Sequence, residues 1–311
     1  MKKLLTAWMI VLCLLALPSV QISAQEDPAK QPGESEHTQT VAPEAEDQSA
    51  QTQSVQTEVE AKAEDQVAEK RKEILTEAMG AVAETRTALK ALEDKKAEEA
   101  LASLEDVMGK LDLIIARDPE LALAPVSVSV MTHDLYASPD TVKQQVKTAK
   151  EFLDEGAVQA ARALLSVMAS EIRIRTTQIP LASYPDAIKA IAPLIDEGKT
   201  EEAKTQLQIA LNTLVVTEEV IPLPVLRAQS LLLAAEKLAG IDQRTADQNS
   251  SLADMLTETR NQIKLAQELG YGEKKMFEPI YDQISQIEKK TQTGKSGTGF
   301  FNEIKKKLSG F

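Results

Sequence analysis

The sequence contains very few of the residues that most often carry out chemistry or form covalent links. Its 311 residues include one cysteine, one tryptophan and two histidines, and aromatic residues make up 3%. The cysteine is Cys13 and the tryptophan is Trp8, so the chain beyond residue 13 contains neither. Such a chain has no disulfide, thiolate nucleophile or thiolate metal site. A core with few aromatic residues must be built from Leu, Ile, Val, Ala and Met, and this composition favours helices.

Positive charge is also scarce. There are 35 Lys and Arg residues against 48 Asp and Glu, which gives a net charge of -13 at pH 7. Nucleic acids and anionic membranes repel a chain of this charge, so neither is expected as a broad partner. The charge favours solubility and attraction of basic partners or cations.

The first 24 residues have the layout of a secretory signal peptide. Lys2 and Lys3 precede an apolar run over residues 4–17, which ends before Pro18. The run is shorter than the ~20 residues that a membrane span needs. We therefore expect cleavage after Ala24 and a periplasmic protein, and an uncleaved anchor is the alternative. Cleavage would leave 33 basic and 48 acidic residues, a net charge of -15.

The remaining chain divides into four predicted segments. Residues 25–62 are rich in Gln, Glu, Ala, Thr, Ser and Pro and have few large apolar residues, which predicts a disordered acidic linker. Apolar residues then recur at helical spacing, and we expect a helical domain over residues 63–240. A coiled-coil-like helical hairpin is expected over residues 241–293. A flexible linker and a short basic amphipathic tail follow over residues 294–311.

A helical hairpin motif occurs three times in the predicted domain. Its copies are ALEDKKAEEALASL at 91–104, FLDEGAVQAARALL at 152–165 and LIDEGKTEEAKTQL at 194–207. Gly156 and Gly198 stand where a left-handed residue ends a helix. The spacings of 61 and 42 residues are irregular, so we expect recurrent hairpins rather than a strict solenoid. The equivalent positions are Leu92, Leu153 and Ile195; Asp94, Glu155 and Glu197; Ala100, Ala161 and Ala203; and Leu104, Leu165 and Leu207.

Three short stretches break the helical pattern. Residues 126–130, 172–175 and 214–221 contain alternating or β-branched apolar residues, which indicates short strands or extended linkers. Residues 225–238 are apolar on nearly all sides, as in a buried central helix. The predicted fold class is mainly α, with antiparallel helical hairpins packed as in tetratricopeptide repeats, short β-strands between them and the C-terminal hairpin.

The order of these elements from about residue 80 to 238 resembles the bacterial YfdX family. The resemblance implies a secreted, mostly helical, stress-associated protein of proteobacteria that self-associates and has no established enzymatic activity. Ser138 before Pro139 is also placed to cap a helix. The matching segments are YASPDTVKQQVKTAKEFL (136–153), LDEGAVQAARALL (153–165), SEIRIRTTQIPL (170–181), LIDEGKTEEAKTQLQIAL (194–211) and TLVVTEEVIPLP (213–224).

No set of residues predicts catalysis, and we expect no catalytic, cofactor-binding or metal-binding residues and no cofactor. His37 lies in the predicted linker, which leaves His133 as the usable histidine. His133 adjoins Asp134, but adjacent residues seldom face one another, so we do not expect the two to act as a catalytic pair. His133 is interpreted either as a pH-responsive residue or as an ordinary surface histidine. The paired acids are interpreted as solvated helix ends. They are Glu98-Glu99, Asp154-Glu155, Asp196-Glu197, Glu201-Glu202 and Glu218-Glu219.

The C-terminal tail combines apolar and basic residues that can share a helix. This arrangement suits weak docking to an anionic surface or to the acidic body of the same protein, and a functionless terminus is the other alternative. The residues are Phe300, Phe301, Ile304, Lys305, Lys306, Lys307, Leu308 and Phe311.

The sequence therefore favours a non-enzymatic, exported, stress-associated protein. It would act by protein–protein interaction or as a holdase, and we expect a homo-oligomer. The alternative is a module that binds a small molecule or cation in a pocket between helical hairpins.

Overall fold

The structure is a computed structural model that describes residues 37–39, 48–292 and 296–311. All described residues belong to one compact unit. The predicted signal peptide and most of the predicted 25–62 linker lie outside the described residues. Among the helices that are described, none has the length and apolar character to cross a membrane.

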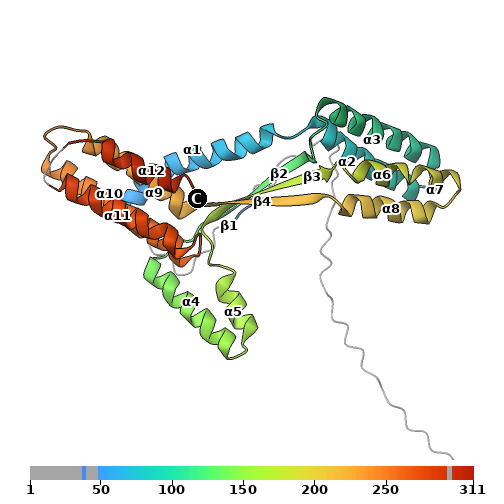
Figure 1. Cartoon of the computed structure of the whole chain (residues 1–311). Helices are drawn as coiled ribbons and strands as arrows, with labels where there is room; N and C mark the ends of the chain where they lie inside the picture. The colour runs from blue at the N-terminus through green and yellow to red at the C-terminus, as the bar shows by residue number, and fades with distance from the viewer. Residues whose placement is uncertain (1–36, 40–47, 293–295) are drawn as a thin grey trace, which may run out of the picture. The chain divides into compact units, whose positions relative to one another are not determined.

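A four-stranded sheet lies between the helical hairpins (Figure 1). Strands β2 (Leu123–His133), β3 (Glu171–Pro180) and β4 (Val215–Pro222) run antiparallel in that order. Strand β1 (His37–Gln39) pairs parallel with the outer edge of β2. The three stretches predicted as strands thus form one antiparallel sheet, and the mainly helical fold class with short strands is confirmed.

The first and third copies of the hairpin motif pack together. The first copy lies in α2 and α3, and the third in α7 and α8, with α6 between the sheet and α7. Their bounds are α2 Thr76–Glu93, α3 Ala97–Arg117, α6 Tyr184–Lys189, α7 Ala192–Asp196 and α8 Thr200–Asn212. These helices share one apolar core, in which Leu92, Leu104 and Leu207 are buried.

The three motif copies turn in the same way. Lys95, Gly156 and Gly198 are equivalent in the motif, and their φ angles are 61°, 75° and 73°. This left-handed conformation strains a residue with a Cβ, so glycine suits it and Lys95 carries the strain in the first copy. The equivalent alanines, Ala100, Ala161 and Ala203, are fully buried where the two helices of each hairpin approach closely.

The second motif copy forms α4 (Pro139–Asp154) and α5 (Val158–Leu165). Ser138 caps α4 as predicted, because its Oγ accepts a hydrogen bond of 3.1 Å from the Thr141 N–H. The first turns of α4 pack on the rest of the chain through Val142, which is buried beside Leu265.

Helix α1 (Ala50–Lys72) corrects the prediction of a disordered linker for residues 50–62. Its Ser49 cap precedes a helix in which Val55, Val59 and Val67 are buried. These valines pack on the sheet and on the central helix α9 (Leu223–Ala239). Their partners are Ile172, Ile174, Ile221, Leu223, Leu226 and Leu231. Three widely spaced valines are enough to pack α1 on the rest of the protein, because their partners are supplied by distant parts of the chain.

The central helix α9 (Leu223–Ala239) is buried, as the sequence predicts, and α10 (Ala246–Glu268) and α11 (Lys274–Thr291) form the predicted hairpin. However, α9 contributes Val225 and Leu232 to the same core as α10 and α11. The expected separation of a 63–240 domain from a 241–293 hairpin therefore differs from the structure. The reason is that α9 is apolar on several sides and packs on both neighbours.

The C-terminal tail is part of this core rather than a free docking segment. It forms a short 3-10 helix, Gly299–Phe301, and α12 (Asn302–Leu308). Phe301, Ile304 and Leu308 are buried, and Lys305 forms an ion pair of 2.9 Å with Glu236. Of the two docking alternatives, the structure shows the one on the protein's own body. The apolar side chains of the tail pack in or against this core, while Lys306 and Lys307 remain exposed.

Candidate functional site

A buried ion pair joins α9 to Asp134, the residue that follows β2. Arg227 of α9 is 2% exposed, and its Nη2 donates to Asp134 Oδ2 over 2.6 Å. The guanidinium carbon lies 5.6 Å from the ring centroid of Tyr136. Burial, and then hydrogen bonding to Asp134, raise the pKa of Tyr136 to about 12. A buried guanidinium requires a carboxylate partner, so Asp134 fixes the loop after β2 against α9.

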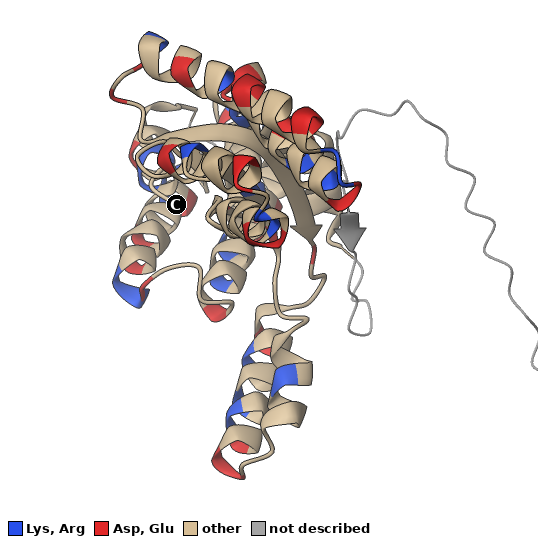
Figure 2. Ribbon diagram, turned by 90° about the vertical axis from the view of Figure 1, so that its right-hand side faces the viewer, with Lys and Arg blue, Asp and Glu red and all other residues tan. Residues whose placement is uncertain are grey.

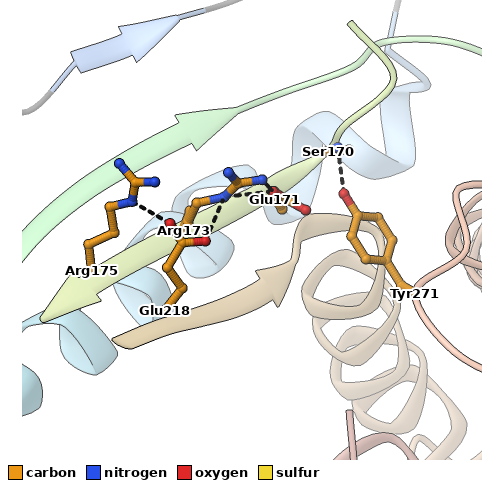
Figure 3. Close-up of polar contacts among 6 residues, drawn as sticks. All are labelled: Ser170, Glu171, Arg173, Arg175, Glu218 and Tyr271. Carbon is orange, nitrogen blue, oxygen red and sulfur yellow. Dashed lines mark hydrogen bonds and ion pairs between the residues drawn. The ribbon is translucent and has the colours of Figure 1, made fainter. Parts of the chain in front are cut away.

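Charged side chains form a row along one face of the sheet (Figure 3). Glu171, Arg173 and Arg175 occupy alternate positions of β3, so they point to the same side. Arg173 Nη2 lies 2.6 Å from Glu171 Oε1, and Arg173 Nε lies 3.9 Å from Glu218 Oε2 on β4. Arg175 Nε also contacts Glu218 Oε1. Because most of these groups are partly exposed, the row contributes to strand register more than to stability.

Ser170 joins the row to the buried ion pair. Its N–H donates to Tyr271 Oη over 2.8 Å, as Figure 3 shows, and its Oγ donates to Asp134 Oδ1 over 3.3 Å. Burial raises the pKa of Tyr271 above its ordinary value, and the Ser170 hydrogen bond opposes this. The polar contacts therefore run without interruption from Arg227 to the start of β3.

A cavity of about 170 Å³ adjoins the buried ion pair. Its walls come from the start of α1, the 135–139 loop, Arg227 and one face of α10. Glu258 Oε1 accepts hydrogen bonds from Thr52 Oγ1 over 2.9 Å and from Gln262 Nε2 over 2.8 Å. These bonds connect α1 with α10 beside the cavity, which is partly open to solvent.

The α4–α5 hairpin presents apolar residues that the other motif copies bury. Leu153 is 48% exposed and Leu165 is 46% exposed. In the first copy the equivalent Leu92 and Leu104 are 1% and 3% exposed. Val146 and Val158 of the same hairpin are also exposed, at 41% and 55%. The second copy thus carries an apolar face with no covering element in the described part of the chain, and both views show this pair apart from the other helices (Figures 1 and 2).

The structure places the histidines and the acid pairs that were singled out from the sequence in different surroundings. His133 ends β2 half-buried, in register with Glu171, while its neighbour Asp134 pairs with Arg227 instead. The side chain of His37 is outside the described residues. All five acid pairs are exposed, and four of them lie at helix ends as predicted. Glu218-Glu219 instead lie in β4, where Glu218 pairs with Arg173 and Arg175. Within residues 48–292 and 296–311, no group of three or more His, Cys, Asp or Glu side chains is placed to hold a metal ion.

Sequence reasoning missed Arg227, Gln262 and the cavity. A signal was present, because Arg227 is the one charged residue among the first thirteen residues of the otherwise apolar α9, and such a residue needs a buried partner. The partner could not be chosen from sequence, since Asp134 is one of 48 acidic residues and lies 93 positions away.

The fold and these sites define a mainly helical protein of recurrent antiparallel hairpins arranged around a small antiparallel sheet. Residues 81–220 match the family described as YfdX protein. One similar solved structure is that of Salmonella Typhi YfdX, with 16% sequence identity and a TM-score of 0.34. That match covers 48% of this chain and 93% of the other. No curated protein matches the sequence.

Proposed function

We propose that this is a non-enzymatic exported protein that acts by protein–protein interaction, as a holdase for stressed clients. The surface assigned to this role is the exposed face of the α4–α5 hairpin, and its occupant is an apolar helical segment of a partly unfolded client. The observation that supports it is the exposure of Leu153 and Leu165, whose equivalents are buried in the first motif copy.

The internal repeats indicate what such a face binds. The first and third copies cover each other, because α2 and α3 share one core with α7 and α8. The motif therefore buries its apolar face against another helical hairpin. An amphipathic helical segment is the matching partner for the second copy.

The charge of the hairpin fits the same occupant. Over residues 139–165 the four basic residues, Lys143, Lys147, Lys150 and Arg162, equal the four acidic ones, Asp140, Glu151, Asp154 and Glu155. The whole chain has a net charge of -13. Basic and acidic positions are interspersed along α4, whereas α5 has one charged residue, Arg162 (Figure 2). A neutral apolar patch on an acidic protein attracts apolar segments while the remaining charge keeps the complex soluble.

Aggregation of a thermally stressed client enzyme, followed by light scattering, tests the proposal. The unaltered protein should suppress aggregation, and more strongly at mildly acidic pH as carboxylate repulsion falls. The variant with Leu153→Ser and Leu165→Ser should lose this effect. Its matched control is Leu113→Ser with Ile209→Ser, which removes residues that are 42% and 49% exposed on other helices.

Two outcomes would reject the proposal. One is an unaltered protein that fails to suppress aggregation at any ratio to the client. The other is equal suppression by the two double variants when both remain folded, as their circular dichroism reports. Particle size at neutral and acidic pH separates a further use of the same face, because self-association through α4–α5 would make the Leu153 and Leu165 variant smaller in solution than the control.

A further inference from the structure

We propose that a cleft at the junction of α1 and α2 binds a small organic cation, an ammonium group attached to an apolar body. The cleft lies where α1 ends and α2 begins, beside the end of α3 and the start of β2 (Figure 1). All of its lining residues lie between positions 73 and 125, outside α4 and α5. This site and the proposed protein-binding role therefore stand or fall separately.

The apolar part of the lining is suited to the body of the ligand. It consists of Leu75, Ile114, Leu121 and Pro125, which come from three separate segments of the chain. The Leu75 N–H donates a hydrogen bond of 3.0 Å to the Pro125 carbonyl oxygen, which ties the α1–α2 junction to β2. The cleft has a volume of about 410 Å³ and is partly open to solvent. This volume lies within the roughly 300–1,000 Å³ that is typical of small-molecule sites.

The charged part of the lining favours a positive ligand. Glu73, Glu77 and Asp118 line the cleft, and Arg117 is its basic lining residue. Arg117 pairs with Glu77, and Lys70, outside the lining, lies 3.7 Å from Glu73. Asp118 is exposed and forms no ion pair within the described part of the chain. After these two pairs are counted, one negative charge remains at the cleft, and we assign the ammonium group to it.

The end of α3 adds to this negative potential. Asp118 is the C-cap of α3, and the last carbonyl groups of a helix carry partial negative charge. A cation is favoured there and an anion is repelled. A metal ion does not match the site, because four lining residues are apolar and the described residues contain no cluster of three or more metal-ligating side chains. An ammonium group at Asp118, with its apolar body on Ile114 and Leu121, matches both parts of the lining.

Calorimetric titration of the full chain tests this ligand chemistry with three probes. Hexylammonium has both proposed features, hexanoate has the opposite charge on a similar chain, and methylammonium has the charge without the apolar body. Hexylammonium should bind at least about tenfold more tightly than either of the others, because it alone combines the ion pair with apolar burial. A smaller preference in either comparison would overturn the assignment.

Asp118→Asn locates the ammonium group. This variant removes the unpaired carboxylate from an exposed position and should weaken hexylammonium binding at least about fivefold. The matched control is Asp94→Asn, because Asp94 is the exposed C-cap of α2 and lies outside the cleft lining. The control makes the same change in net charge at a helix end and should leave binding unchanged. Equal effects of the two variants would mean that the overall charge of the protein attracts the cation, and the assignment would be wrong.

Leu121→Ser locates the apolar body. Leu121 is half-buried in the lining, and its polar replacement should also weaken hexylammonium binding at least about fivefold. Its matched control, Leu113→Ser, changes a leucine of α3 that is 42% exposed and lies outside the lining. Unchanged binding in a folded Leu121→Ser protein would contradict the proposal. If that variant does not fold, Asp118→Asn decides, because it changes an exposed side chain.

Discussion

Arg227 and Asp134 form a 2.6 Å ion pair across 93 positions of the sequence, and it joins α9 to the end of β2. The guanidinium is 2% exposed and the carboxylate side chain 12%. Such a pair is insulated from screening by salt, so its loss is felt more than that of the exposed pairs on α1 or α8. It also sets the position of the 135–139 loop, which forms one wall of the cavity.

Asp134→Ala should destabilise the protein by about 3 kcal/mol, because it leaves the Arg227 charge buried without a carboxylate. Urea unfolding followed by circular dichroism measures this. A double variant, Asp134→Leu with Arg227→Met, removes both charges and should recover most of the loss. Additive losses in the double variant would show that the two residues are not energetically coupled.

The shared left-handed turn predicts opposite effects of two substitutions. Gly156→Ala should destabilise the protein by about 1 kcal/mol, because alanine is strained at a φ of 75°. No atom lies within 4 Å of the added Cβ, so a steric clash does not contribute. Lys95→Gly should stabilise by about 1 kcal/mol, because it relieves the same conformation in the first copy. Thermal unfolding compares both with the unaltered protein. Shifts of the same sign would contradict the equivalence of the two turns.

All four tyrosines should ionise late in alkaline titration. Burial is the largest cause of the raised pKa of Tyr136, which is about 12. Burial also raises the pKa values of Tyr184, Tyr271 and Tyr281 above their ordinary value. The neutral rings stabilise the fold below pH ~10, the unfolded pKa, and this contribution is lost as the pH rises through the folded values. Ultraviolet absorbance should show tyrosinate forming near pH 10 in urea but only above it in buffer. Coincident titrations would contradict the burial of these rings.

Ile304→Ala in α12 should cost ~3 kcal/mol, because Ile304 is fully buried in the core of α9, α10 and α11. Its control, Lys306→Ala, changes an exposed neighbour and should alter stability by less than about 0.5 kcal/mol. Chemical denaturation measures both. Equal, small effects would mean that the tail is not part of the core.

The elements that sequence predicts well are those with a local pattern. Val128 and Val130 alternate with serines, and Gly198 marks a turn, so strands and hairpins are visible within ten residues. Helix α1 lacks such a pattern because Val55, Val59 and Val67 are its only buried apolar residues. Its partners come from β3, β4 and α9, more than 100 positions later.

The sites are harder to predict than the fold. The cavity takes residues from four elements, and Gln262 differs from other glutamines only through its surroundings. The exposed hairpin is a different case. Sequence reveals the repeat that contains Leu153 and Leu92, yet burial depends on whether another hairpin lies opposite, and only the structure shows that the second copy has none among the described elements.

Helix α1 also has a consequence for the order in which the chain can fold during synthesis. Thr52 donates a hydrogen bond to Glu258, 206 positions later, and the valines of α1 pack on β3, β4 and α9, which are synthesised after α1. On the ribosome this segment emerges early, and its permanent contacts arrive only when most of the polypeptide has been made. Contacts of such long range form slowly. The nascent chain would thus keep the apolar side of α1 uncovered until late in synthesis.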